Sequence, residues 1–297
     1  MTFYENLNLW VPPISDIERW WRDGRCNLLA RIYKAINEAF FECTPAKDLL
    51  LIAFCRSLIQ WSNAAFNHQS MSFKEPQNTL FDDYEEELLL GEFIKNAFTI
   101  VDTASQEIKG HVNVIQTDAR CVPKPENDQY DCVITSPPYP NRMSYIRELR
   151  PYMYWLKYLK EPREAGELDW KAIGGTWGIA TSWVAQWKPD DIFINYPGFE
   201  KMIGAIANQS QVLANYVHKY FIDISLHLTS LSPHIVSGGK IFYIIGNSKF
   251  YDTLVPVEEI YVSILQQVGY INPEMTLLRK RNSKKELYEF IVSAEKP

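Results

Sequence analysis

With 297 residues, 46% of them hydrophobic and 14% aromatic, the chain can form a core in one large or two modest domains, which excludes a disordered or low-complexity protein. Five scattered cysteines without a Cys-x-x-Cys pair or a nearby pair of histidines argue against disulfides and a zinc site, and the lack of a signal peptide or membrane-length apolar run predicts a cytoplasmic protein without a membrane partner. The formal net charge of −6 excludes a uniformly basic surface, so nucleic-acid contacts have to be local or lie largely on another chain.

Residues 1–108 are expected to form a helical region. Apolar side chains recur at helical spacing over 16–41, and a proline suits the first turn of a second helix at 45–67. This second helix is apolar on most sides, which predicts that it is buried. A polar stretch separates it from a third helix at 82–102, whose first turn is acidic and therefore stabilises the helix dipole.

Short β-strands replace the helical pattern in residues 109–297. A strand is expected at 111–115, followed by a polar turn at Thr117–Arg120 and a second strand at Cys132–Thr135. A helix is expected at 144–159, where apolar and aromatic residues recur every three or four positions. Strands alternating with helices favour an α/β domain.

Two consecutive prolines end the second strand, because neither can donate a backbone hydrogen bond and each fixes φ. Ser136, Pro137, Pro138 and Tyr139 therefore lie at the carboxyl end of a strand, which is where open α/β sheets bind ligands. A proline-rich turn without a ligand is the alternative interpretation of this tetrapeptide.

Together with the threonine before it, the tetrapeptide resembles the catalytic motif of the amino-directed DNA methyltransferases. These enzymes transfer a methyl group from S-adenosylmethionine to N4 of cytosine or N6 of adenine. The serine form is similar to the cytosine-N4 branch, since adenine enzymes more often have Asp or Asn at that position. The resemblance implies that Ser136, Pro137, Pro138 and Tyr139 are catalytic and that S-adenosylmethionine is the cofactor.

The chemistry of the target amine explains these residue types. An exocyclic base amine is a poor nucleophile, because its lone pair is delocalised into the ring. The Ser136 oxygen and the Pro137 carbonyl can each accept one amine hydrogen, which would direct the lone pair toward the methyl sulfonium, and the stiff prolines preorganise that carbonyl. Tyr139 offers a flat face for a base that is flipped out of the duplex.

The turn before the motif carries the implied cofactor contacts. A strand, then Asp118-Ala119, then a loop and the motif strand resemble the segment in which an aspartate binds the adenine amine of the cofactor. The resemblance therefore implies Asp118, Ala119 and Thr135 as cofactor-binding residues. Capping of the turn by the Asp118 side chain is the alternative.

Residues 160–200 are expected to be irregular, because they contain several glycines and prolines and four tryptophans. Long loops of this kind are uncommon unless they are functional, so this one is interpreted as a lid or a target-recognition segment, with a packed structural loop as the alternative.

A long amphipathic helix is expected at 198–231. A Ser-Gly-Gly turn then leads into a strand at 240–245 that ends in Gly-Asn-Ser, again similar to these methyltransferases. The remaining predicted elements are a helix at 257–268 and strands at 274–278 and 287–294.

Candidate DNA contacts occur in two places. Three residues follow the motif closely and would shape the base pocket. The run Arg279–Lys285 holds five cations in seven residues and is expected to form a basic hairpin tip between the last two strands. Such a tip can contact DNA phosphates, and a solvated turn without a ligand is the alternative. The predicted DNA contacts are Asn141, Arg142, Tyr145, Arg279, Lys280 and Arg281.

Two features of the methyltransferase family are missing from the sequence. No Gly-x-Gly occurs, so the glycine-rich loop that admits the methionine part of the cofactor is absent, as is the acidic residue that binds its ribose. In the family's sheet order, 3-2-1-4-5-7-6, the chain has candidates for strands 3 to 7 but none for 1 and 2. Such a gap would leave buried backbone groups unpaired at a cost of roughly 1–3 kcal/mol each. The chain therefore resembles the downstream half of a split enzyme, and a second chain is expected to carry the glycine-rich half.

The predicted fold is α/β, with a class I methyltransferase-like (Rossmann-like) sheet that is incomplete in this chain, preceded by a helical region. The predicted function is a subunit of a site-specific DNA methyltransferase that modifies an exocyclic amine, cytosine N4 being favoured. An adenine-N6 or RNA-base methyltransferase is the second hypothesis. A non-catalytic DNA-binding or scaffold subunit with a relict motif is the third; the intact Ser-Pro-Pro-Tyr disfavours it, whereas the missing glycine loop and the acidic charge favour it.

Overall fold

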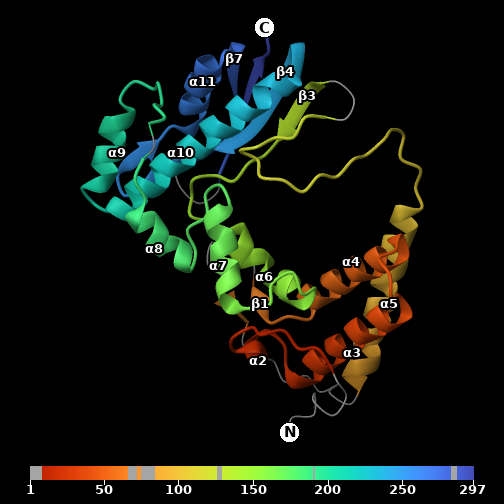
Figure 1. The fold of residues 1–297 in the computed structure, drawn as a ribbon. Coiled ribbons are helices and arrows are strands. Elements are labelled where there is room, and N and C mark those ends of the chain that lie inside the picture. Colours follow the sequence, from red (N-terminus) through yellow and green to blue (C-terminus); the bar gives the residue numbers. More distant parts are fainter. Residues whose placement is uncertain (1–8, 66–71, 75–83, 126–128, 190, 282–285) are drawn as a thin grey trace. The chain divides into compact units, whose positions relative to one another are not determined.

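The computed structural model describes residues 9–65, 72–74, 84–125, 129–189, 191–281 and 286–297. The protein contains both helices and a mixed sheet (Figure 1). It divides into two compact units, which we call the helical unit (Met1–Val112 and Glu148–Glu164) and the sheet unit (Asn113–Arg147 and Ala165–Pro297). None of the described helices is long and apolar enough to cross a membrane.

The helical unit is built around buried tryptophans. Trp155 lies in the segment Glu148–Glu164, which returns to this unit. It is fully buried and lies edge-on to Trp21 and Phe54, with ring centroids 5.8 and 5.7 Å from its own. Aromatic side chains bury a large area each, so these rings dominate the core. The elements of the unit are α2 (Ile17–Trp20), α3 (Asp23–Ala39), α4 (Pro45–Gln60), β1 (Ala64–Ala65), β2 (Ser72–Phe73), α5 (Glu85–Ala104) and most of α6 (Tyr145–Trp155).

The second predicted helix is shorter and less buried than the sequence suggested. Thr44 caps α4 by accepting a hydrogen bond from the Lys47 amide, but the helix ends at Gln60 instead of extending to residue 67. It buries one face, whereas Ile52 is half exposed, because the neighbouring helices cover fewer positions than the sequence makes apolar. The start predicted for the third helix, at 82–83, lies outside the described residues, and α5 begins at Glu85.

The sheet unit contains a four-stranded sheet in the order β3-β4-β8-β7 (Figure 1). Strands β3 and β4 are parallel, and the other two pairings are antiparallel. Its strands are β3 (Tyr130–Thr135), β4 (Ile235–Gly246), β7 (Ile271–Lys280) and β8 (Tyr288–Glu295), and a separate small hairpin contains β5 (Ser248–Phe250) and β6 (Thr253–Val255). Its helices are most of α7 (Pro162–Lys171), α8 (Ile179–Gln186), α9 (Phe199–Ala207), α10 (Gln211–Leu231), the short η2 (Ser232–His234) and α11 (Val257–Val268).

Helices α10 and α11 cover one face of this sheet (Figure 1). Alternate β4 residues, Ile241, Tyr243 and Ile245, are fully buried in the core that they share with these helices. Phe242 and Ile244 point to the other face, as the two-residue period of a strand requires, and are only half-buried. The predicted helix 257–268 is confirmed as α11, which ends at Gly269 with φ 98°.

Two predicted elements differ from the structure around this core. The single helix expected at 198–231 is two helices, because the Ser210 hydroxyl accepts a hydrogen bond from the Leu213 amide and starts α10 anew. The Ser-Gly-Gly turn expected before the strand at 240–245 lies inside β4 instead. There Gly238, with φ 77°, donates its amide to the Lys296 carbonyl at 2.8 Å, and the pairing with β3 shifts register. Glycine permits this left-handed position within a strand.

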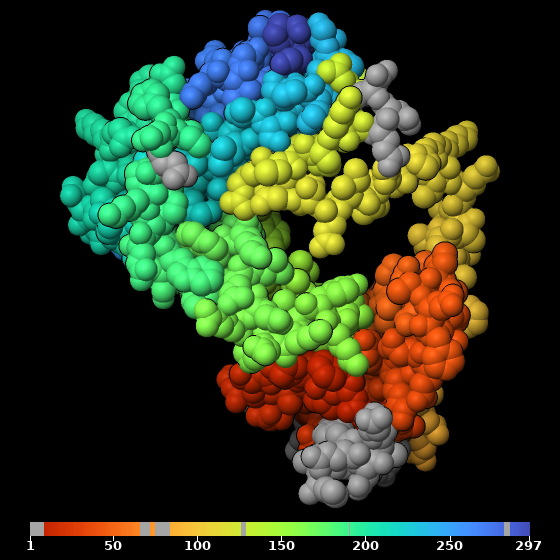
Figure 2. Space-filling model, in the orientation of Figure 1, coloured from red at the N-terminus to blue at the C-terminus, as the bar shows by residue number. Residues whose placement is uncertain are grey.

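The strand predicted at 111–115 is not formed. These residues have no regular secondary structure, and the whole stretch 101–119 is exposed. The space-filling view shows side chains of this yellow segment uncovered (Figure 2). The physical reason is that a strand needs a neighbour for its backbone hydrogen bonds, and the described sheet begins at β3 with no strand on its far side.

The prediction that 160–200 is irregular was wrong for about half of its length. Helices α7 and α8 occupy Pro162–Lys171 and Ile179–Gln186, separated by a glycine-containing loop. The proline opens α7, where its missing amide costs nothing. At the other helix, the Asn215 side-chain amide donates to the Val184 carbonyl at 2.9 Å and so satisfies the end of α8. This long-range contact stabilises a short helix that could not be recognised in the sequence, because the glycines and tryptophans around it are typical of a loop.

Candidate active site

The Ser-Pro-Pro-Tyr motif leaves β3 at its carboxyl end, beside the parallel strand β4. Thr135 is level with Tyr243 of β4, so the motif begins at the edge of the sheet where both strands end. The Ser136 side chain is exposed and makes no hydrogen bond to any described residue. Pro137 and Pro138 are half-buried. The serine hydroxyl is therefore available to an external donor.

Tyr139 lies across the end of β4. A Cβ atom at Gly246, the last residue of that strand, would be 2.9 Å from Cδ2 and Cε2 of the tyrosine ring. The Arg281 guanidinium lies over the ring, 5.7 Å from its centroid, and its Nη1 donates to the Asn247 carbonyl at 3.2 Å. Gly246, which follows the predicted strand 240–245, is thus required for the packing of the motif tyrosine.

Gly246→Ala is expected to lower the unfolding free energy of the sheet unit by about 1–3 kcal/mol, because the added methyl group overlaps the Tyr139 ring. Gly204→Ala in α9 is the matched control, since a Cβ there meets nothing within 4 Å and should leave stability unchanged or raise it. Chemical denaturation of both variants measures the difference. Equal stability of the two would show that the ring is not packed on this glycine.

The segment after the motif is held by local and long-range hydrogen bonds. Asn141 Oδ1 accepts the Met143 amide at 3.0 Å, so this predicted DNA contact shapes the turn. Arg142 has a left-handed φ of 64°, and its amide donates to the Tyr216 hydroxyl on α10 at 3.1 Å. Tyr145, the first residue of α6, is 46% exposed. The backbone of this segment is therefore fixed to α10.

A buried carboxylate that the sequence did not single out supports the same segment. The Ser144 hydroxyl donates to Asp169 and accepts the Arg147 amide at 3.0 Å, which caps the start of α6. Asp169 also accepts the Trp177 amide at 2.6 Å. Burial raises the pKa of Asp169, and the hydrogen bonds from Ser144 and the amides oppose that shift.

Gly174 and Gly175 are the feature of the sequence that could have indicated a close backbone approach here. A Cβ at Gly175 would lie 1.7 Å from the Asp169 carbonyl oxygen, and one at Gly174 would lie 3.6 Å from Pro138. Glycine is needed where backbones approach this closely. The loop between α7 and α8 therefore packs beside the motif.

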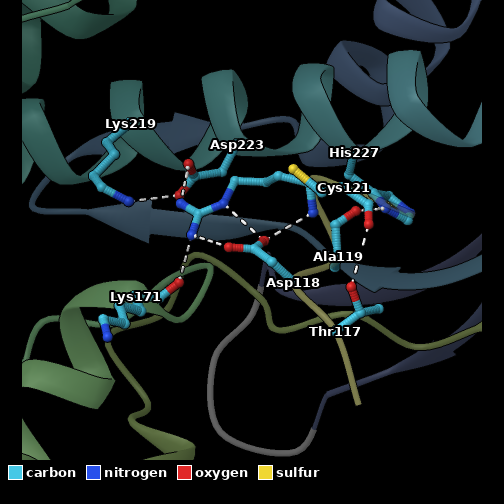
Figure 3. Close-up of polar contacts among 9 residues, drawn as sticks. Thr117, Asp118, Ala119, Cys121, Lys171, Lys219, Asp223 and His227 are labelled. Carbon is cyan, nitrogen blue, oxygen red and sulfur yellow. Dashed lines mark hydrogen bonds and ion pairs between the residues drawn. The ribbon is translucent and has the colours of Figure 1, made fainter. Parts of the chain in front are cut away.

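Asp118 forms the turn-capping arrangement that was the alternative to a cofactor contact (Figure 3). Its Oδ1 accepts the Arg120 amide at 2.9 Å, and its carbonyl accepts the Cys121 amide at 2.9 Å. The Arg120 guanidinium also binds both carboxylate oxygens, and these hydrogen bonds hold the pKa of Asp118 below its usual value. The side chain is nevertheless 46% exposed. Capping leaves part of the carboxylate open to a ligand.

His227 of α10 fixes the next residue of this turn (Figure 3). Its Nδ1 is 2.7 Å from the Ala119 carbonyl oxygen, and its Nε2 is 2.7 Å from the Tyr243 hydroxyl. Burial lowers the pKa of His227. The neutral ring with a proton on Nδ1 donates to the carbonyl and accepts from the tyrosine, which satisfies all three groups.

The basic run is divided among different environments. Arg279 and Lys280 still belong to β7, because they pair with Glu289 and Tyr288 of β8. The hairpin tip therefore begins two residues later than predicted. Arg279 pairs with Glu289 at 2.5 Å, whereas Lys280 is exposed and Arg281 contacts the motif tyrosine. The rest of the tip, 282–285, lies outside the described residues.

The described side chains contain no group of three or more His, Cys, Asp or Glu residues that could hold a metal ion. The five cysteines are free thiols. Comparisons with protein-family models, with curated proteins and with solved structures found no match to this chain.

Proposed function

We propose that this chain is the catalytic-motif half of a two-chain, S-adenosylmethionine-dependent DNA methyltransferase that modifies an exocyclic amine, with cytosine N4 as the target. The observation that carries the proposal is the position of Ser-Pro-Pro-Tyr at the carboxyl end of β3, in a sheet ordered β3-β4-β8-β7. This order corresponds to the 4-5-7-6 part of the sheet that the sequence resemblance implies. In open α/β sheets, ligands bind at this edge.

The exposed serine suits the first chemical task, which is to activate a weak amine nucleophile. The Ser136 hydroxyl and the Pro137 carbonyl would each accept one amine hydrogen of the flipped base, leaving the nitrogen lone pair directed at the methyl donor. The nitrogen–methyl bond forms as the methyl–sulfur bond breaks, and the amine then loses one proton to water. Tyr139 would stack on the base.

The cofactor would supply the electrophilic methyl group, and only part of its binding site fits this chain. The partly exposed carboxylate of Asp118 suits an adenine amine; Ala119 follows it directly, and Thr135 is the last residue of β3. The sequence has no Gly-x-Gly to admit the methionine part. A partner chain that carries the glycine-rich half accounts for this division.

The edge of the sheet also supports a second chain. β3 has no described neighbour on one side, and its Ile134 side chain is 74% exposed. The apolar segment at 111–115 is likewise unpaired. Strands of a partner would pair with both and bury them, since an open apolar edge strand favours association.

A non-catalytic subunit is the alternative function. The acidic net charge of −6 favours it, because contact with DNA phosphates requires basic residues.

Isothermal titration tests the division of the cofactor site. The isolated chain should show no micromolar binding of S-adenosylmethionine, whereas the complex that co-purifies with the chain from its native host should bind it. Micromolar binding by the isolated chain would overturn the two-chain proposal.

DNA methylated by the complex and digested to nucleosides should give N4-methylcytosine, and a methyladenine peak without methylcytosine would overturn the choice of base.

A further inference from the structure

Arg120 has almost no capacity left to bind an external anion. Its Nε donates to Asp118 Oδ1 at 3.0 Å, and its Nη2 donates to Asp118 Oδ2 at 2.7 Å and to the Lys171 carbonyl at 2.8 Å. Its Nη1 donates to Asp223 Oδ1 at 3.0 Å. Four of the five N–H groups of the guanidinium are thus used within the protein. The guanidinium therefore serves to hold Asp118, Asp223 and the Lys171 carbonyl together.

Asp118 is only partly satisfied by these contacts. Its Oδ1 accepts the Arg120 amide and Nε, and its Oδ2 accepts Nη2. A carboxylate offers about four lone-pair positions, so one position on Oδ2 remains. Because Arg120 lowers the pKa of Asp118, the group stays ionised and can accept an amine N–H. The contacts of Arg120 with Asp118 and Asp223, which we call the clamp, therefore fix the carboxylate and leave one acceptor position of this 46% exposed side chain unused.

The clamp is anchored in α10. The Asp223 side chain is 5% exposed and also binds Lys219, whose Nζ lies 2.6 Å from Oδ2. Two cations and two carboxylates give the cluster no net charge, which makes its burial tolerable. The Val122 amide donates to the Ser230 hydroxyl of α10 at 2.8 Å, so the end of the turn is held by the same helix.

We propose that Arg120 is a positioning residue that holds the Asp118 carboxylate on α10, ready to accept the adenine amine of the cofactor before a partner chain binds. The inference rests on the proposed function for the identity of the ligand, but the clamp itself is a property of this chain. Arg120 acts through Asp118 and does not contact the cofactor.

Arg120→Met tests the clamp, with Lys219→Met as the matched control. Each variant removes one cation from Asp223, but only Arg120 also binds Asp118. Hydrogen exchange of the isolated chain should show the amides of residues 120–122 exchanging about tenfold faster in Arg120→Met, and within about twofold of the wild type in Lys219→Met. Arg120→Lys keeps a charge beside Asp223 and should give a smaller change in the same direction, which guards against a folding failure of the methionine variant.

Steady-state kinetics of the co-purified complex tests the role in cofactor binding. Arg120→Met should raise the KM for S-adenosylmethionine about tenfold with kcat within about twofold, because a misplaced acceptor weakens binding more than chemistry. Unchanged exchange at 120–122 in Arg120→Met overturns the clamp, and an unchanged KM in an active complex overturns the positioning role. If the wild-type complex neither binds the cofactor nor methylates DNA, the proposed function fails, while the exchange data still decide whether the clamp exists.

Discussion

Ser136→Ala should lower the kcat of the complete two-chain enzyme by roughly 30- to 1000-fold, which corresponds to about 2–4 kcal/mol of activation free energy. The reason is that the substitution removes one of the two acceptors that make the base amine nucleophilic. The Ser136 side chain is exposed and has no hydrogen bond to any described residue, so its removal should leave the stability of the chain nearly unchanged. The loss should therefore appear in turnover, with a normal melting temperature.

Ser237→Ala provides the matched control for this variant. Ser237 is also exposed, but it lies near the beginning of β4, whereas the motif is level with the carboxyl end of that strand. Incorporation of labelled methyl groups into DNA should be unaffected there. Near-normal methylation by Ser136→Ala would instead mean that the motif is structural, and the non-catalytic subunit would become the better hypothesis.

Trp155→Ala should destabilise the helical unit by about 3–5 kcal/mol, the cost of removing a large buried aromatic side chain. Trp155 is fully buried and contacts the rings of Trp21 and Phe54, so the alanine leaves a cavity between elements distant in sequence. It lies at the end of α6, whose first residues follow the motif. Most of α6 belongs to the helical unit, so the packing of this helix depends on that unit's core.

Tyr158→Ala tests the specificity of that effect. Tyr158 is three residues away but 73% exposed, so its removal should change the unfolding free energy by less than about 0.5 kcal/mol. Urea denaturation followed by tryptophan fluorescence compares the two variants. A small effect of Trp155→Ala would contradict the assignment of Glu148–Glu164 to the helical unit.

Elements governed by nearby residues followed from the sequence alone. The helix at 257–268 was predicted with its observed bounds, because its apolar spacing and the glycine after it act within a few residues. The end of β3 was predicted correctly from the two prolines, which remove backbone donors wherever they occur. The sequence also determined that Ser136 and Tyr139 follow a strand, and this is the part of the candidate site that it could locate.

Tertiary structure decided which of the remaining predictions hold. The residues 111–115 have the composition of a strand but form none, since a strand depends on a neighbour and none of the described strands pairs with them. Arg281 reached the motif tyrosine and Asp169 reached Ser144 only because folding brings distant segments together. The clamp on Asp118 joins Arg120 to Asp223, 103 residues further along the chain. Local patterns specify backbone conformation, but a hydrogen bond between distant side chains depends on how complete elements pack, and no short stretch of sequence encodes that packing.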